Sequence, residues 1–490
     1  MLRRLGLTLS IVLVIVGPQL VAQSPDLETL YATAQEAESS GDLSTAIGAY
    51  RKIVLLEPTL AEAFANLGSL YLRVEDAAQA RLALEHAIRL KPSLAGPHFF
   101  LGVLSFKDGD FLKALREFKR ADSLQPGVID TESYLGYTEY ALGHYANASD
   151  YLARSCRRSS QDAQLWYSLS KTYARLAEQN IRSLLSSFPG SDEAIFVRGQ
   201  QYEANGTYSL AIEEYRKLED RHARIRGLQE HISQLAALSN QGTAGALRLP
   251  TEGVALSFVN DERPALDADA SLLWEEKRVA LAQQQSLSAV RCYSLGDGYR
   301  SMSYLASEHV IAVAPDSARA HQLQGQKFEA LGKDEEAITE YRRAVALAPG
   351  ITNLHFSIGN LFWKEHRLSE ALIELQSEEK LDGTNALAHY EIGDIFFSTH
   401  RFDLAQGELM EAIRLEPNLP SAYAALADIR AAQNDLAGAE RYLFEAIQHA
   451  PTEASLHYRL ALLLRRRKMT ARADEEMKTF QRLNSNERAK

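Results

Sequence analysis

The chain has 490 residues, of which 46% are apolar and 24% are charged, and its formal net charge is −11 at neutral pH. This composition is that of a folded protein and excludes wholesale disorder. The acidic balance makes nucleic acid a poor candidate partner, because neutralisation of phosphates supplies much of the affinity of proteins for it.

The first predicted element is an apolar segment at the N-terminus. Arg3 and Arg4 precede the run LTLSIVLVIVGPQLVA, and Ala22 suits the position before a cleavage site. We therefore predict a signal peptide over residues 1–22 and an exported protein, periplasmic or secreted. The alternative is an uncleaved anchor helix, which Pro18 and the modest length disfavour, since a span needs about 20 apolar residues. No later stretch is long and apolar enough to cross a membrane.

Beyond this segment, small residues recur at intervals of 34 positions. Glycines keep the interval at Gly68, Gly102 and Gly136, and again at Gly325, Gly359 and Gly393. Alanines keep it at Ala46, Ala80, Ala114 and Ala148, and again at Ala337, Ala371, Ala405, Ala439 and Ala473. A period of this length predicts stacked copies of one supersecondary unit.

The segment ALGKDEEAITEYRRAVALAP, residues 330–349, resembles the tetratricopeptide repeat, in which 34 residues form two antiparallel helices. Gly332 permits the turn between the helices, Ala337 lets them cross closely, and Pro349 ends the second helix. Regular repeats start near residues 27, 61, 95, 129, 192, 318, 352, 386, 420 and 454.

Two further units are shortened, from Tyr173 to Pro189 and from Tyr299 to Pro315. With them, the resemblance implies an all-α fold, an α-solenoid that winds as a right-handed superhelix of about 11–12 helix-turn-helix repeats.

The repeats fall into two arrays. A short unit followed by a regular one occurs twice, which indicates two arrays of related construction. We place the N-terminal array at residues 23–225 and the C-terminal array, with a capping helix, at 291–490. Residues 226–290 lose the period, and glycines and prolines punctuate them, so we interpret them as a joint of degenerate helices with a loop.

The stretch HYEIGDIFFSTH, residues 389–400, concentrates two histidines, a glutamate and an aspartate. His389 occupies the fourth repeat position, where a large flat side chain normally packs against the neighbouring helix. Its own helix offers Ile392 and Gly393 at the spacing where a second metal ligand would have to lie. Equivalent histidines of adjacent repeats are roughly 10 Å apart, too far to share an ion. His400 takes the place of the turn glycine. We therefore expect no metal site, and no cofactor.

A ligand of such a solenoid is expected on the concave face, which the first helix of each repeat lines. In the family that the chain resembles, positions 2, 5, 9, 12 and 13 of that helix usually touch the ligand. Here position five holds Tyr31, Phe99, Phe356, Tyr390 and Tyr458; position nine holds Tyr137, Asn360, Asp394 and Asp428; position twelve holds Phe106, Tyr140, Trp363 and Phe397. Aromatic rings of this kind are over-represented at binding hot spots.

The function that the resemblance implies is a non-enzymatic scaffold or adaptor that binds segments of partner proteins in this groove. Together with the predicted export, it suggests a complex in the cell envelope. The chain lacks the spacing of the common catalytic motifs, so we expect no enzyme activity. The alternative is a glycan-binding accessory subunit of an envelope polysaccharide or secretion system, because aromatic rings and carboxylates also suit sugars.

Overall fold

The computed structural model describes residues 25–204, 207–221, 228–240, 275–276, 279–280, 282–285, 287–451 and 453–489. In these residues the regular structure is helical. The contacts divide the chain into two compact units. The first holds residues 1–179, 267–281 and 295–314, and the second holds residues 180–266, 282–294 and 315–490.

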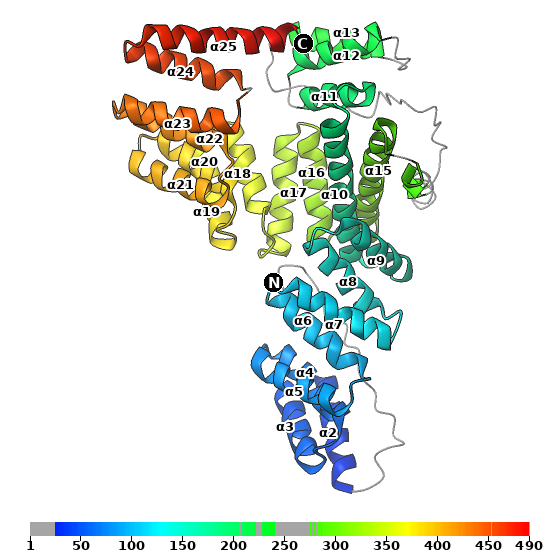
Figure 1. The fold of residues 1–490 in the computed structure, drawn as a ribbon. Helices are drawn as coiled ribbons and strands as arrows, with labels where there is room; N and C mark the ends of the chain where they lie inside the picture. Colours follow the sequence, from blue (N-terminus) through cyan, green and yellow to red (C-terminus); the bar gives the residue numbers. More distant parts are fainter. Residues whose placement is uncertain are drawn as a thin grey trace. The chain divides into compact units, whose positions relative to one another are not determined.

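In the first unit, consecutive helices from residue 25 to residue 158 pack against one another in chain order (Figure 1). The helices of this unit are α2 (Pro25–Ser40), α3 (Leu43–Leu56), α4 (Ala61–Arg73), α5 (Ala77–Leu90), α6 (Ala95–Lys107), α7 (Phe111–Leu124), α8 (Ile129–Ala141), α9 (Tyr145–Arg158), the first part of α10 (Ala163–Ser187) and the last part of α15 (Ala289–Val313).

The second unit holds the remaining helices. They are the ends of α10 and α15 that the first unit lacks, α11 (Asp192–Ala204), α12 (Tyr208–Asp220), α13 (Leu228–Asn240), α16 (Ala318–Ala330), α17 (Asp334–Leu347), α18 (Leu354–Lys364), α19 (Leu368–Leu381), α20 (Ala386–Ser398), α21 (Phe402–Leu415), α22 (Pro420–Ala432), α23 (Leu436–His449), α24 (Ala454–Arg466) and α25 (Thr470–Ala489).

The regular repeats are helix pairs, as predicted. Ten such pairs occur in the described ranges, and each consists of a first helix such as α16 and a second helix such as α17. The periodic alanines explain the close packing, because Ala46, Ala80, Ala114, Ala148, Ala337, Ala371, Ala405, Ala439 and Ala473 are all completely buried. The all-α solenoid of stacked helix pairs is thereby confirmed.

The turns between paired helices also repeat. Gly332 has a φ of 68°, in the left-handed region that favours glycine. The same turn position has a φ of 57° at His366 and 59° at His400. Histidine is among the residues that tolerate this conformation, although less readily than glycine. The conformational role predicted for His400 is therefore confirmed.

The two shortened units differ from the prediction of helix pairs. Each is one uninterrupted helix of 25 residues, α10 and α15. The residues that are missing relative to a regular repeat are those that would make a turn, so the chain continues as a helix. Within the first unit the two helices meet side by side, with the rings of Tyr173 and Tyr299 stacked at 6.0 Å and Ser170 Oγ 2.6 Å from Ser307 Oγ.

Two predictions about the ends of the arrays stay predictions. The signal peptide at residues 1–22 lies outside the described residues. The predicted joint at 226–290 includes α13, but 241–274 also lie outside them, so the array boundaries at 225 and 291 are untested.

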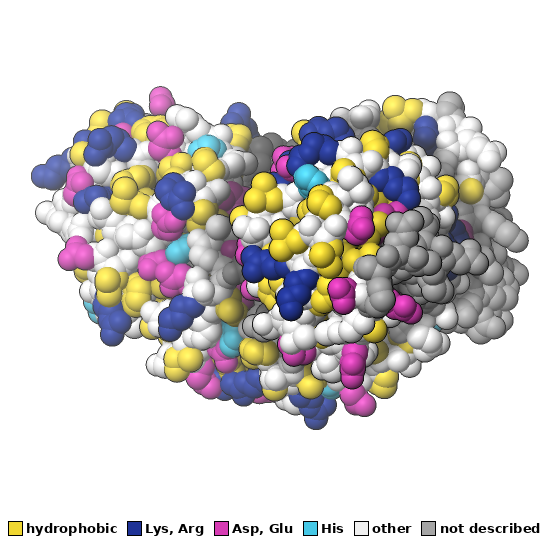
Figure 2. All heavy atoms as spheres, turned by 90° about the horizontal axis from the view of Figure 1, so that it is seen from below, with side chains coloured by type: hydrophobic (Ala, Val, Ile, Leu, Met, Phe, Trp, Pro, Cys, Tyr) yellow, Lys and Arg dark blue, Asp and Glu magenta, His cyan; other side chains and the backbone are white. Residues whose placement is uncertain are grey.

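The described surface is mixed in character. Among the described residues, none of the helices has the length and apolarity needed to cross a membrane. On the face drawn in Figure 2, acidic and basic side chains are interspersed with apolar ones. On that face, therefore, the net acidity of the chain is not gathered into one patch of a single sign.

Candidate functional site

The candidate site lies on the first helices of the second unit. Eight of the predicted ligand-binding residues belong to it: Phe356, Asn360 and Trp363 on α18, Tyr390, Asp394 and Phe397 on α20, Asp428 on α22, and Tyr458 on α24. All are half-buried except Tyr458, which is 41% exposed. Side chains in this state are held in place by neighbours and still reach solvent, as a binding surface requires.

Hydrogen bonds join α18 to α20 in a regular pattern. The Trp363 Nε1–H donates to Asp394 Oδ2 at 2.9 Å, and the Asn360 amide donates to Glu391 Oε1. In both bonds the acceptor lies 31 residues after the donor, three residues short of the 34-residue repeat. Each side chain of α18 therefore reaches a residue of α20 that lies about one helical turn before the equivalent repeat position. We call Asn360, Trp363, Tyr390, Glu391 and Asp394 the acidic–aromatic row.

The aromatic members of the row are in contact. The rings of Trp363 and Tyr390 meet edge to face at 6.4 Å. Burial raises the pKa of Tyr390, and the negative charge of Asp394 adds to this shift, so its hydroxyl stays protonated at neutral pH. The row therefore combines ring faces, a hydroxyl and carboxylate acceptors on a surface that its own hydrogen bonds hold in place.

Glu391 is the most unusual member of the row. It is 4% exposed, and its Oε2 has no hydrogen-bond partner among the described residues. Burial raises the pKa of Glu391 to about 7, although the hydrogen bond from Asn360 and the charge of Lys364 act in the opposite direction. An unsatisfied buried carboxyl oxygen is costly, so a donor supplied by a ligand would be favourable here.

A second link joins α22 to α24. Arg459 forms an ion pair with Asp428 and also donates to the Ala424 carbonyl oxygen at 2.8 Å. The Asp428 charge is thus neutralised within the protein. In the described part of the chain no cation forms an ion pair with Asp394, so its negative charge on α20 is not neutralised in the same way.

The corresponding positions of the first unit differ. Phe99 and Phe106, predicted for the ligand-binding face, are only 5% exposed and belong to the core. The reason is Tyr134 on α8, whose ring lies 5.6 Å from Phe99 and 5.9 Å from Phe106 and covers both. The prediction of a ligand contact is wrong for these two residues.

The remaining predicted residues of the first unit are half-buried tyrosines. Tyr31 and Tyr137 pack against the same core, and Tyr140 meets the ring of Tyr145 at 5.4 Å. The described structure brings no carboxylate row to them like that on α20. The ligand-binding role proposed for them stays a prediction.

Sequence reasoning missed Glu391 and Arg459. Both occupy repeat position six, directly after an aromatic fifth position, and Tyr134 occupies position six of its own repeat. Position six holds residues as different as Ala32, Phe100 and Leu323 in other repeats, so a reading of it would have singled out Glu391 and Arg459 only as the charged residues among them.

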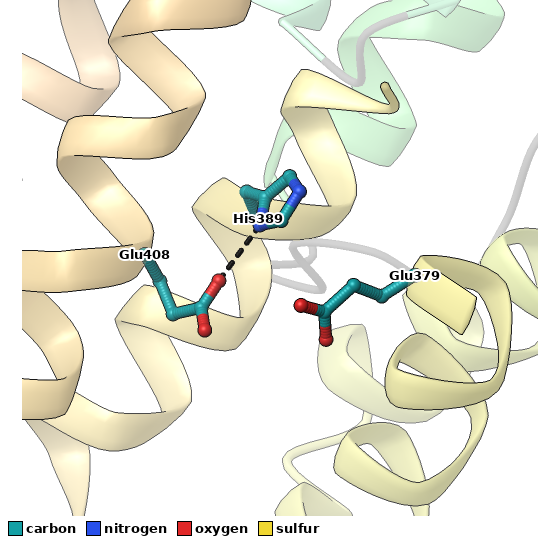
Figure 3. Close-up of side chains that lie close together, drawn as sticks. All are labelled: Glu379, His389 and Glu408. Atoms are coloured by element: carbon teal, nitrogen blue, oxygen red, sulfur yellow. Dashed lines mark hydrogen bonds and ion pairs between the residues drawn. The ribbon is translucent and has the colours of Figure 1, made fainter. Parts of the chain in front are cut away.

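The histidine row forms intramolecular pairs. In five repeats the histidine Nδ1 lies 2.6–2.8 Å from a glutamate 19 residues later, on the second helix of the same pair. The expectation that His389 has no second ligand nearby is wrong. Glu408 and Glu379 both lie close to it (Figure 3), because they come from α21 and α19, and spacing along α20 alone could not reveal them.

Comparison with known proteins agrees with this architecture. Two family models described as tetratricopeptide repeat match the chain, one at residues 305–350 and 390–454 and the other at residues 61–94. No curated protein matches it.

Several solved structures are similar at low identity. MamA from Desulfovibrio magneticus RS-1 is 18% identical, with 35% of this chain and 97% of that chain covered and a TM-score of 0.33. YrrB, whose structure is described as that of a TPR protein with an unusual peptide-binding site, is 16% identical, with 36% and 91% covered and a TM-score of 0.32. The APC/C hetero-tetramer Cut9-Hcn1 is 16% identical, with 95% and 88% covered and a TM-score of 0.35.

The family models cover repeats in both halves of the chain, and the paired helices, buried alanines and left-handed turns recur beyond the matched ranges. The chain contains tetratricopeptide repeats, which the family models match at residues 61–94, 305–350 and 390–454.

Proposed function

We propose that this protein is a non-enzymatic scaffold of the cell envelope that binds partner segments across the first helices of its second unit. Repeats of this family support a protein-interaction role. The acidic–aromatic row carries the more specific proposal, because it presents the rings of Trp363 and Tyr390 and the carboxylate of Asp394 at a half-buried surface that internal hydrogen bonds hold in place.

The chemistry of the row favours partner segments that carry basic and apolar side chains. Asp394 attracts a lysine or arginine, and Trp363 and Tyr390 lie beside it for the aliphatic stem of such a residue or for stacking. A carboxylate-terminated peptide would meet like charge at the same place. The envelope location rests on the predicted signal peptide at residues 1–22.

A capture experiment tests this function. The bait is the predicted mature chain, residues 23–490, and it is compared with a variant carrying Trp363→Ala, Tyr390→Ala and Phe397→Ala. A matched control carries Leu404→Ala and Met410→Ala, two exposed residues of the second helix α21. Circular dichroism establishes that all three remain folded.

We expect envelope proteins captured by the wild type and by the α21 control to be lost with the triple variant. Equal capture by all three would contradict recognition at the row and move it to another face. If none of them captures a protein, titration with oligosaccharides tests the glycan-binding alternative, and saturable binding of a sugar would replace the present proposal.

A further inference from the structure

Three side chains outside the acidic–aromatic row converge between consecutive repeats. Glu379 on α19, His389 on α20 and Glu408 on α21 each place one potential metal-ligand atom within 4.8 Å of the other two. Figure 3 shows both carboxylates directed toward the imidazole from opposite sides. His389 is 5% exposed, and the two glutamates are half-buried.

The hydrogen bonds of His389 favour a cation at this place. The Nε2 atom lies 3.3 Å from the Gly383 carbonyl oxygen, and Nδ1 lies 2.7 Å from Glu408 Oε2, the distance of a hydrogen bond with a proton between the two atoms. A metal ion bound to Nδ1 would take the place of that proton, while Nε2–H still donates to Gly383. A backbone carbonyl that accepts from the other ring nitrogen is also a common second partner of metal-binding histidines.

Glu379 distinguishes this place from the other histidine–glutamate pairs. Among the described residues, no hydrogen bond or ion pair engages its carboxylate. The equivalent position is Val345 one repeat earlier and Ile447 two repeats later. A charged residue thus stands where an apolar one packs in those repeats, and its carboxylate lies near both His389 and Glu408.

The repeat that contains His457 provides an internal control. His457 Nδ1 lies 2.7 Å from Glu476 Oε2, and its Nε2 lies 3.2 Å from the Pro451 carbonyl oxygen, which reproduces both contacts of His389. Only the third group differs, because Ile447 replaces Glu379. The histidine–glutamate pair is therefore a structural feature of several repeats, and Glu379 is an addition to it.

We propose that Glu379, His389 and Glu408 bind a divalent cation of the zinc class, which links α19, α20 and α21 of two consecutive repeats. One neutral imidazole and two carboxylates carry two negative charges, which such an ion neutralises. Imidazole nitrogen with carboxylate oxygen is a ligand set that suits zinc. Ligands around a tetrahedral zinc lie about 3.4 Å apart, which rotation of the glutamate side chains can reach.

The test is metal binding by the full-length, untagged protein after treatment with a chelator. Zn²⁺ is titrated by calorimetry, and Co²⁺ is followed through its visible absorption bands. We expect one equivalent of either ion to bind and the thermal unfolding midpoint to rise. Glu379→Ile, which introduces the residue found in the repeat of His457, is expected to weaken binding at least about tenfold, since it removes one of three ligands.

The reciprocal variant Ile447→Glu is expected to create a second site beside His457, so that two equivalents bind. Circular dichroism reports whether this variant folds, and Glu379→Ile alone decides the proposal if it does not. Absence of binding by the wild type, or binding by Glu379→Ile equal to that of the wild type, would overturn the assignment.

Discussion

Replacing Phe99 with alanine is expected to lower the free energy of unfolding of the first unit by about 3–5 kcal/mol. The ring is 5% exposed and contacts the rings of Phe100, Phe118 and Tyr134, with centroids 5.3–5.8 Å apart. The substitution would leave a cavity inside this cluster, whereas a ring on a binding face could be removed at little cost. Denaturant unfolding followed by circular dichroism measures the difference.

Leu112→Ala in the same unit is the control, because Leu112 is 60% exposed on α7 and its loss should change stability by no more than about 0.5 kcal/mol. If Phe99→Ala lowered the free energy of unfolding as little as Leu112→Ala, the Phe99 ring would be exposed. Its assignment to the core of the first unit would then be wrong.

Replacing Gly325 with alanine is expected to destabilise the second unit by about 1–3 kcal/mol, although alanine favours helices. An added Cβ would lie 2.6 Å from the ring of Tyr341 on the paired helix α17. That ring is 1% exposed, and its hydroxyl donates to Glu329 Oε2 at 2.8 Å, so it has little freedom to move aside. The thermal unfolding midpoint should fall.

Gly407→Ala is the matched control for this overpacking. Gly407 lies inside α21, and an added Cβ there would meet no atom within 4 Å. Only the helix propensity then changes, and stability should rise by about 0.5–1 kcal/mol. A stabilising Gly325→Ala would show that the helices of a pair can separate, and that the periodic glycines are not required for close packing.

The sequence predicted the features that local sterics impose within one repeat. An alanine at the helix crossing and a left-handed residue in the turn each follow from space or backbone conformation. Ala337 and His400 are examples that the structure confirms. The 34-residue interval then repeats these features, so the fold could be predicted from very few positions.

What the sequence left open depends on contacts between neighbouring repeats. Phe99 is covered because the next first helix carries Tyr134, whereas Tyr390 remains half-buried because Ala425 stands at that position of its next repeat. Glu379 reaches His389 from another helix. None of these relations follows from the position of a residue within its own repeat, and so the candidate site was predicted less accurately than the fold.

The most direct test of the account is site-specific photo-cross-linking of the mature chain in its native envelope. A benzophenone amino acid replaces Phe397 on α20, next to the acidic–aromatic row, or Leu404 on α21, which is 53% exposed. We predict adducts with a partner protein from position 397 and none from position 404, and loss of the adduct when Asp394→Ala is added. An adduct that forms from position 404 but not from 397 would contradict recognition by the first helices.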